Sequence, residues 1–544
     1  MPKLMIDGRE IEVPKGTRVI EAAKRLGIEI PYYCYHPGLT VAGNCRMCLV
    51  EIEKMPRLQI ACHMEAQDGM VVRTDTEKIR QTRKHVLEFL LSNHPVDCPV
   101  CDQAGECWLQ DYYMKHGLYA SRLAEDKIKK HKAVVLGPTV ILDSERCILC
   151  SRCVRFTDEI SKTHELGIVN RGDHSEITID PNRALENAYS GNVVDVCPVG
   201  ALTDRDFRFK IRAWYLSSGN SVCSGCARGC NIQVQYNLDR PHHGKGARVM
   251  RVKPCFNADI NQWWICDEGR YGYKFHDQNR ILQPVSRSGQ TAREVAWEGV
   301  LSEVAQKLGG SREKIGIFVS PQLTNEELFL IRGFFKEGLK CPNLFLLSPK
   351  SEGRQDDFLI RADKNPNSKG AELLGFPYDP KAISTFASKC SLGAVDGVIV
   401  FGQDLLSLKN TSLDKSVLEK LKWSVFIGSN HNATSDRASV VLPSATYVEK
   451  EGSFTNFEGR IQRFKKVLEP LAGSRTEFEI LRALSGLLKI AFRYQTTEDV
   501  FTHLQAHEKP FQGLPCVQIG MGGTDIRVLA EPVIPAIEQK GDIL

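Results

Sequence analysis

A chain of 544 residues is too long for one hydrophobic core, so the sequence predicts several domains. Apolar residues make up 42% of the chain and charged residues 25%, a balance that excludes a largely disordered protein. The formal net charge is +5, and the densest basic run is the short KIKKHK at 127–132, so no nucleic-acid partner is expected.

The N-terminus and the cysteine usage indicate where such a chain works. The first residues, MPKLMIDGREIEV, lack a basic region followed by an apolar core, and no run of about eighteen apolar residues occurs, so we expect neither secretion nor direct membrane insertion. Cysteine occurs 19 times, and sixteen of these residues precede residue 270. Because cytosolic thiols stay reduced, metal or redox chemistry is favoured over disulfides.

The first residues predict a small α+β domain that ends near residue 73. KLMIDGREIEV has the pattern of two alternating strands joined by the two-residue turn Asp7-Gly8. A helix is predicted over 17–26, with Gly27 placed to end it. A cysteine-bearing loop over 34–48 then leads into CLVEIE, which alternates like a strand.

A second helix is predicted over 75–92, and it delivers the chain to His94. Thr74 and Glu77 have the spacing of a capping box, and the apolar residues of this segment recur at helical intervals. The charged residues 115–135 that follow are typical of a linker.

The rest of the chain shows two kinds of pattern. Residues 140–205 and 221–270 hold further cysteines, and strand-like runs in the latter flank the polar DRPHHGKGA, which is typical of a hairpin tip with His242 and His243 at the surface. Beyond about 285, apolar runs such as KIGIFVS, DGVIVFG and SVFIGS alternate with helical stretches. That alternation predicts an α/β domain with a mainly parallel sheet.

Fifteen cysteines and one histidine fall into four groups of four candidate metal ligands. The first group is spaced C-x10-C-x2-C-x13-C and the second H-x3-C-x2-C-x5-C, whereas the third and fourth each combine three close cysteines with a distant one. In chain order the groups are Cys34, Cys45, Cys48 and Cys62; His94, Cys98, Cys101 and Cys107; Cys147, Cys150, Cys153 and Cys197; and Cys223, Cys226, Cys230 and Cys266.

Soft thiolates at these spacings favour iron-sulfide clusters, because a gap of two or three residues lets one turn of backbone aim neighbouring sulfurs at one cluster. The third group, C-x2-C-x2-C with a distant Cys-Pro, is a broken form of the bacterial ferredoxin signature and points to a [4Fe-4S] cluster. Structural zinc and inert buried thiols are the alternatives. For His94 the alternative is a helix cap or a core histidine, although Pro95 favours an extended exit from the helix.

The order of the groups, with the one-histidine group second, resembles the large iron-sulfur subunits of NADH:quinone oxidoreductase, respiratory complex I, over essentially the whole chain. The resemblance implies a [2Fe-2S] cluster on the first group and one [4Fe-4S] cluster on each of the others, the fourth being present in only some members. The implied domains are a β-grasp ferredoxin domain (1–75), a His-ligated [4Fe-4S] domain (76–120), a ferredoxin-like [4Fe-4S] domain (135–212), a molybdopterin-oxidoreductase-type [4Fe-4S] domain (218–275) and a degenerate molybdopterin-oxidoreductase-like α/β domain (285–544).

Two positions compete for the last ligand of the fourth group, Cys255 and Cys266. The stretch NQWWICDEGRYG at 261–272 resembles the Cys-x-x-Gly-Arg closing motif of the [4Fe-4S] domain in molybdopterin oxidoreductases, which favours Cys266.

The second half resembles molybdopterin enzymes at 432–462, but no molybdenum is expected, because the isolated Cys341 and Cys390 lie in no recognisable ligand loop. No GxGxxG opens a helix after a strand, the nearest run being GMGGTD at 520–525, and no G-x4-GK[ST] occurs. NAD and FMN are therefore expected on a partner and not on this chain.

Four clusters without a substrate pocket indicate electron transfer. The resemblance implies that electrons come from a flavin/NADH-binding subunit, pass through the first three clusters and leave toward quinone-side subunits, with the fourth cluster off the main route. No catalytic residue is expected on this chain, which would be a peripheral subunit on the cytoplasmic side of the inner membrane. The alternatives are an iron-sulfur subunit of an NAD-linked hydrogenase or formate dehydrogenase and, in a different class, a zinc-bound scaffold.

Overall fold

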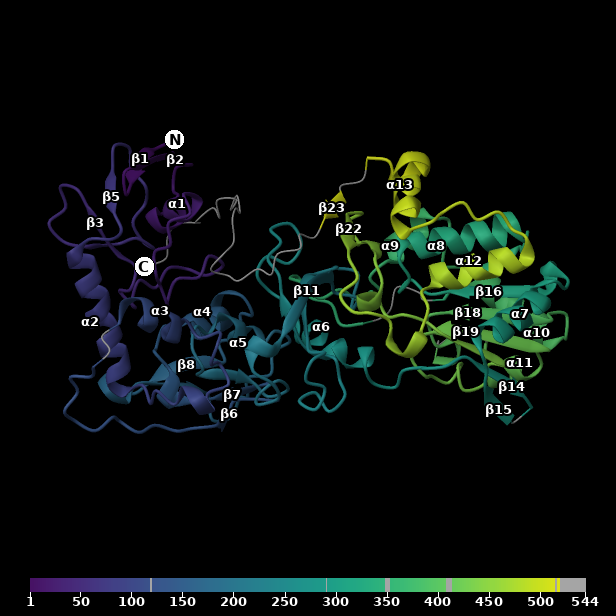
Figure 1. Cartoon of the computed structure of the whole chain (residues 1–544), viewed down its shortest axis with the longest axis horizontal. Helices are drawn as coiled ribbons and strands as arrows, with labels where there is room; N and C mark the ends of the chain where they lie inside the picture. Colours follow the sequence, from purple (N-terminus) through teal and green to yellow (C-terminus); the bar gives the residue numbers. More distant parts are fainter. Residues whose placement is uncertain (118–119, 290, 348–352, 408–412, 514–515, 519–544) are drawn as a thin grey trace.

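The computed structural model describes residues 1–117, 120–289, 291–347, 353–407, 413–513 and 516–518, and it arranges them in two lobes (Figure 1). The N-terminal lobe, in purple and blue, holds the first three cysteine groups, and the C-terminal lobe, in green and yellow, holds a large sheet with helices on it. The teal strands of the fourth group lie between the lobes. The run GMGGTD lies outside the described residues, as does most of the chain end after 513.

The N-terminal domain is a mixed sheet in the order β2-β1-β5-β3-β4, against which α1 (Val19–Arg25) packs. The predicted hairpin is confirmed, because Ile6 pairs with Arg9 and the turn residues Asp7 and Gly8 have φ of 48° and 77°, as a type I′ turn requires. The strands are β1 (Lys3–Ile6), β2 (Arg9–Glu12), β3 (Leu49–Ile52), β4 (Gln59–Ile60) and β5 (Val71–Arg73).

Helix α2 spans Glu77–Asn93, and the capping box predicted from Thr74 and Glu77 is wrong. The N-cap is Thr76, whose Oγ1 accepts the backbone N–H of Ile79 at 3.3 Å. The backbone N–H of Thr74 (2.7 Å) and its hydroxyl (2.5 Å) both donate to the carboxylate of Asp7. Because the hairpin turn engages Thr74, the helix begins two residues later.

Short elements carry the second and third cysteine groups. Helices α2 and α3 (Trp108–His116) flank the second group, and α4 (Arg152–Glu159) and α5 (Asn192–Val196) carry the third. These helices share one hydrophobic core, which includes Leu87, Trp108, Phe156 and Val196. The strands are a sheet in the order β10-β7-β6 and a β8–β9 hairpin: β6 (Val134–Val135), β7 (Val140–Leu142), β8 (Leu166–Val169), β9 (Glu176–Ile179) and β10 (Leu202–Asp204).

The fourth group lies on an antiparallel sheet of β11 (Ser217–Val222), β12 (Asn231–Tyr236) and β13 (Val249–Pro254), followed by α6 (Asp267–Tyr271). The predicted hairpin tip is confirmed, because residues 237–248 join β12 to β13 and His242 is exposed there. His243 is half-buried beside Tyr215.

The C-terminal lobe is the predicted α/β domain. Its sheet has the order β15-β14-β20-β19-β18-β16-β17, in which the strands from β20 to β17 run parallel and β14 pairs antiparallel with both β20 and the edge strand β15. Alternate residues face two cores: Ile317 packs with helices α7, α8, α12 and α13, and Phe318 packs with α10 and α11. The strands are β14 (Val285–Ser288), β15 (Thr291–Glu294), β16 (Ile315–Val319), β17 (Asn343–Leu346), β18 (Gly397–Phe401), β19 (Trp423–Gly428) and β20 (Val440–Pro443).

The helices of this lobe are α7 (Trp297–Leu308), α8 (Asn325–Ile331), which continues as a π-helix (Arg332–Gly338), α9 (Ser368–Leu373), α10 (Pro380–Ser391), α11 (Lys415–Glu419), α12 (Glu477–Leu488) and α13 (Thr497–His507). A small sheet of β21 (Gly452–Thr455), β22 (Ile461–Phe464) and β23 (Cys516–Gln518) lies next to β11. Within the described ranges, no helix combines the length and the hydropathy that crossing a bilayer requires.

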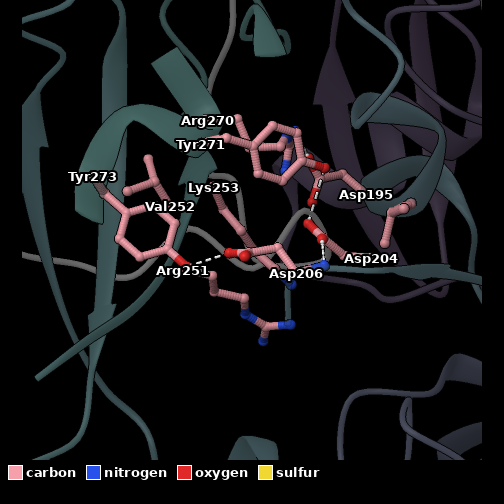
Figure 2. A pocket seen from close by; sticks show the side chains of 10 residues that line it. Asp195, Asp204, Asp206, Arg251, Val252, Lys253, Arg270, Tyr271 and Tyr273 are labelled. Carbon is pink, nitrogen blue, oxygen red and sulfur yellow. Dashed lines mark hydrogen bonds and ion pairs between the residues drawn. The ribbon is translucent and has the colours of Figure 1, made fainter. Parts of the chain in front are cut away.

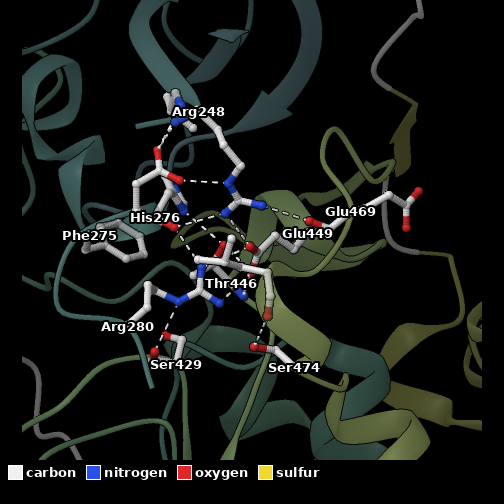
Figure 3. Close-up of polar contacts among 12 residues, drawn as sticks. Arg248, Phe275, His276, Arg280, Ser429, Thr446, Glu449, Glu469 and Ser474 are labelled. Atoms are coloured by element: carbon white, nitrogen blue, oxygen red, sulfur yellow. Dashed lines mark hydrogen bonds and ion pairs between the residues drawn. The ribbon is translucent and has the colours of Figure 1, made fainter. Parts of the chain in front are cut away.

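A buried charged network joins the fourth-group domain to the C-terminal lobe (Figure 3). Glu449, whose side chain is 0% exposed, accepts two hydrogen bonds from the guanidinium of Arg280, each at 2.9 Å. Arg248, at the end of the hairpin tip, donates to the same carboxylate at 2.6 Å and also pairs with Asp277 at 2.8 Å. His276 contacts Thr446 through Nδ1 at 3.0 Å. The fourth-group domain and the C-terminal lobe are therefore held together by buried ion pairs.

Candidate iron-sulfur sites

The first group lies where the loop after α1 meets β3 and β4. Side-chain hydrogen bonding with Cys45 and Cys62 lowers the pKa of Cys34, and side-chain hydrogen bonding with Cys62 lowers the pKa of Cys48. The backbone N–H of Tyr33 donates to the sulfur of Cys45 at 3.4 Å. The structure therefore brings all four predicted sulfurs of this group together.

The second group lies between the end of α2 and the start of α3. Cys98 opens a short 3-10 turn, the N–H of Cys101 donates to the carbonyl of Cys98 at 3.1 Å, and Cys107 immediately precedes α3. Burial, with a smaller contribution from the charge of Cys101, raises the pKa of Cys107 to about 12. Cys98 likewise acts on Cys101. The three cysteines therefore share one neighbourhood.

His94 is the C-terminal cap of α2, in the extended conformation (φ −65°, ψ 132°) that Pro95 favours. Burial lowers the pKa of its imidazole to about 4, and the charges of Asp97 and Arg146 act on it. The same two side chains form an ion pair at 2.6 Å and act on Cys101. The imidazole of His94 and the thiol of Cys101 thus lie beside the same ion pair. Nδ1 of His94 accepts the backbone N–H of Val96 at 3.1 Å.

The third group gathers at the start of α4 and the end of α5. Burial raises the pKa of Cys153 well above its usual range, and the charges of Cys150, Cys147 and Cys197 raise it further. Cys197 caps α5, and burial raises its pKa to about 11. Sequence spacing placed these four residues in one group, and the structure brings them together.

The fourth group gathers around Gly269. A side chain at Gly269 would lie 3.0 Å from the sulfur of Cys223 and 3.5 Å from that of Cys266, so both sulfurs border this glycine. The charges that most raise the pKa of Cys230, after burial, are those of Cys223, Cys226 and Cys266. Cys255 is placed differently, with its sulfur 3.6 Å from Oδ1 of Asn220. The geometry therefore favours Cys266 over Cys255.

The ligand loops carry backbone strain at residues other than glycine. Arg46 in the first group has φ of 58°, and Leu149 and Ser151 in the third have φ of 53° and 59°. The left-handed conformation costs such residues about 1–2 kcal/mol each, and it persists where the surrounding structure enforces it. These conformations are explained by the need to direct the sulfurs of neighbouring cysteines toward one point.

The donor set fits iron-sulfide cages. The fifteen predicted sulfurs are buried or half-buried and form no disulfide. Burial and mutual repulsion raise the pKa values of most of these thiols. The thiols therefore lose their protons together when bound cations compensate the negative charge of the thiolates. Across the described residues, no three His, Cys, Asp or Glu side chains meet closely enough to hold a single metal ion. The ligands of a cluster, in contrast, are spread over several iron atoms.

The groups border one another in a fixed pattern. The charge of Cys34 acts on Cys150, which links the first group to the third. The charge of Cys197 acts on Cys107, and a side chain at Gly200 would overlap the sulfur of Cys101 at 2.3 Å, which links the third group to the second. The third group therefore borders both the first and the second.

Polar side chains that sequence reasoning missed connect the groups. Asn192, fully buried on α5, donates to the carbonyl of Ile265 at 2.7 Å and accepts its N–H at 3.1 Å, which ties the third group to the segment before Cys266. Arg152 and Arg155, on α4, contact the first group. The signal in the sequence is two arginines that flank the last cysteine of a C-x2-C-x2-C run.

A small polar pocket lies between the third and fourth groups (Figure 2). Its side chains mostly bind one another: Arg270 pairs with Asp195, Tyr271 donates to Asp204 at 3.1 Å, and Tyr273 donates to Asp206. These contacts join α5 and β10 to α6, so the pocket helps to fix the spacing of the two groups.

Family models match the chain in five consecutive segments. They are a 2Fe-2S iron-sulfur cluster binding domain (2–77), an NADH-ubiquinone oxidoreductase-G iron-sulfur binding region (83–122), an NADH-quinone oxidoreductase subunit 3 ferredoxin-like domain (137–203), an NDSU1/NuoG-like 4Fe-4S domain (219–274) and molybdopterin oxidoreductase (365–487). The expected fold class is thereby confirmed: a 2Fe-2S ferredoxin domain, 4Fe-4S domains and a C-terminal molybdopterin-oxidoreductase domain.

Relatives match over nearly the whole chain. The NADH-quinone oxidoreductase G subunit of Rickettsia bellii is 31% identical, with 94% of this chain and 90% of the relative covered. The mitochondrial NADH-ubiquinone oxidoreductase 78 kDa subunit of Candida albicans is 28% identical over 92% of this chain and 84% of its own. A solved chain of NAD+-reducing [NiFe]-hydrogenase is 31% identical with a TM-score of 0.36, covering 39% of this chain and 90% of that one. From its match to the Rickettsia protein, the chain belongs to the family of NADH-quinone oxidoreductase G subunits.

Proposed function

We propose that this chain, an iron-sulfur electron-transfer subunit of NADH-quinone oxidoreductase, relays single electrons from a flavin on a partner subunit toward quinone. The observation that carries the proposal is the contiguity of its ligand groups, since Cys34 borders Cys150 and Cys197 borders Cys107. A bound cluster accepts and releases one electron at a time. The neighbour relations support the order first, third, second, with the fourth cluster off the main route beside the third.

The ligands are assigned as follows. Cys34, Cys45, Cys48 and Cys62 hold a [2Fe-2S] cluster; His94, Cys98, Cys101 and Cys107, then Cys147, Cys150, Cys153 and Cys197, then Cys223, Cys226, Cys230 and Cys266 each hold a [4Fe-4S] cluster. The convergence of the sulfurs supports each set. The division into domains at 1–75, 76–120, 135–212, 218–275 and 285–544 belongs to the same proposal.

Molybdenum has no part in this function. Cys341 is 1% exposed and Cys390 0%, and each lies in a hydrophobic core of the C-terminal lobe. Both residues support the fold.

The partners are the flavin/NADH-binding subunit, other peripheral-arm subunits and the quinone-side subunits, and FMN and NAD are held by the first of these. The chain works as a peripheral subunit on the cytoplasmic side of the inner membrane. The Rickettsia and Candida relatives are named as subunits of NADH-quinone and NADH-ubiquinone oxidoreductase, which supports other subunits of that complex as the partners.

Metal and sulfide analysis of the full-length chain, purified without oxygen, tests the proposal. We expect about fourteen iron atoms and as many acid-labile sulfides per chain, without molybdenum or zinc. A matched pair of variants tests the fourth ligand set: Cys266→Ala should lose about four iron atoms, and Cys255→Ala should keep them all. Iron-free protein with zinc would favour a scaffold, and stoichiometric molybdenum would favour a formate-dehydrogenase-like function; either result would overturn the proposal.

A further inference from the structure

Two arginines on α4 lie between the first and third ligand groups. We propose that Arg152 and Arg155 are positioning residues that clamp these two sites at a fixed spacing and raise the reduction potentials of both clusters through buried positive charge. The inference rests on the proposed ligand sets and adds a role for residues that are not ligands.

Arg152 bridges the loops of both groups through its guanidinium. The side chain is 1% exposed; Nη2 donates to the carbonyl of Tyr35 at 2.6 Å and Nη1 to the carbonyl of Val196 at 3.0 Å. Tyr35 follows Cys34, and Val196 precedes Cys197, so one planar fork holds a residue next to a ligand of each group.

Arg155, three residues further along α4, repeats this bridge. Its Nη2 donates to the carbonyl of Cys34 at 2.5 Å and to that of Cys150 at 3.4 Å, so it contacts one proposed ligand of each group directly. Its Nη1 donates to the carbonyl of Thr40 in the first loop. Together the two side chains bridge the first and third groups by hydrogen bonds to four backbone carbonyls, each of which belongs to a proposed ligand or to its neighbour in sequence.

Neither guanidinium has a carboxylate within ion-pair distance among the described residues. The nearby carboxylate of Glu159 accepts from Thr40 instead. A buried cation is costly unless an anion lies close to it. Apart from the carboxylate of Glu159, which acts on Arg155 from beyond ion-pair distance, the anionic groups that face these arginines are thiolates. The charge of Arg152 and then of Arg155 acts on Cys150, and Cys150 and Cys34 act on Arg155.

Arg152 also reaches the second group. Its guanidinium lies 4.5 Å from the ring centroid of Trp108, and Trp108 directly follows Cys107. The cation is therefore stacked on an aromatic ring, which fixes its position next to a residue that adjoins the second group.

A fixed buried cation favours the more negative state of a nearby cluster. Reduction adds one electron, and the attraction of that electron to the guanidinium is weakly screened away from water. Removing the cation therefore destabilises the reduced state more than the oxidised one, which lowers the potential.

EPR-monitored redox titration of the full-length chain, purified without oxygen, tests the inference. We expect Arg152→Met to shift the one-electron equilibrium of the first and third clusters at least tenfold toward oxidation, which is about 59 mV. Arg152→Lys, which keeps the charge but not the fork, should retain most of the potential. Arg332→Met is the control, because Arg332 pairs with Glu508 in the C-terminal lobe, and it should shift neither potential.

The outcomes separate the inference from the proposed function. Iron-free wild-type protein would overturn the proposed function. Wild-type and Arg152→Met proteins with the same iron content and the same potentials would overturn the inference alone, as would equal shifts in the Met and Lys variants. Should Arg152→Met fail to fold, Arg155→Met is measured in the same way: a lowered potential supports the inference, and an unchanged one overturns it.

Discussion

His94 differs from the other proposed ligands in charge. Because burial lowers the pKa of its imidazole to about 4, the ring is neutral at pH 7. A neutral ligand in place of a thiolate removes one negative charge from the second cluster, which favours the reduced state and raises its potential. We expect His94→Cys to lower that potential in an EPR-monitored titration of the full-length chain.

The control for this substitution is His85→Cys, which adds a thiol to the same helix at a residue that contacts Gln81 at 2.9 Å. Ligation requires one local change at His94. A ring bound through Nε2 carries its proton on Nδ1, and a ring bound through Nδ1 has no lone pair left there, so the contact from Val96 opens in either case. An unchanged potential in His94→Cys would show that His94 is not a ligand.

Spacing in the sequence predicted which cysteines lie together, because short gaps within a loop leave neighbouring sulfurs few other directions. It did not predict the left-handed backbone at Arg46, Leu149 and Ser151, since local preference disfavours that conformation and the convergence of distant cysteines imposes it. Nor did it predict Arg152, whose partners Tyr35 and Val196 are 117 and 44 residues away.

At the scale of single elements, the start of α2 offers a direct test. Thr76 caps the helix, whereas Thr74 binds Asp7. Thr76→Ala should cost the helix about 1 kcal/mol and speed amide hydrogen exchange in its first turn roughly fivefold. Hydrogen-exchange mass spectrometry of peptides from 77–93 measures the effect.

The matched control is Asp379→Ala at the N-cap of α10, where Asp379 accepts the N–H groups of Lys381 and Ala382 at 3.0 Å. Exchange should rise in α10 and stay unchanged in α2. If Thr74→Ala, and not Thr76→Ala, released the first turn of α2, the assignment of the cap would be wrong.

Elements were predictable where the signal is local. The Asp7-Gly8 turn and the end of α1 just before Gly27 follow from the preferences of the residues themselves. The cap of α2 was not predictable, because two threonines offer similar local signals and a contact with a residue 67 positions away decides between them.

At the scale of the whole molecule, the sequence predicted a cysteine-rich half and an α/β half, but it did not predict the contacts that join them. The joining network connects Arg248 to Glu449 over 201 residues and Arg280 to Glu449 over 169, and such separations leave no pattern in the chain. Alternation of strands and helices is a periodic signal, whereas an interface is a set of single contacts.

Glu449 therefore carries a prediction about the molecule as a unit (Figure 3). Burial opposes its ionisation, but the hydrogen bonds and charges of Arg280 and Arg248 outweigh burial and hold its pKa below the usual range. Glu449→Gln leaves two buried arginines without their shared anion, so it should lower the free energy of unfolding by about 3–5 kcal/mol. Glu458→Gln, which removes a half-exposed partner 3.8 Å from Arg228, should change stability by about 0–1 kcal/mol.

The stability difference between wild type and Glu449→Gln should decrease at acid pH. A carboxyl whose pKa is lower in the folded state stabilises the fold above its unfolded pKa, near 4.3 for glutamate, and that contribution is lost as the pH falls through the folded value. The gap in melting temperature between wild type and Glu449→Gln should therefore be full at pH 7 and shrink below about pH 4. Thermal scans across this range measure it. Equal melting temperatures for Glu449→Gln and Glu458→Gln at pH 7 would mean that the charged network does not hold the fourth-group domain and the C-terminal lobe together.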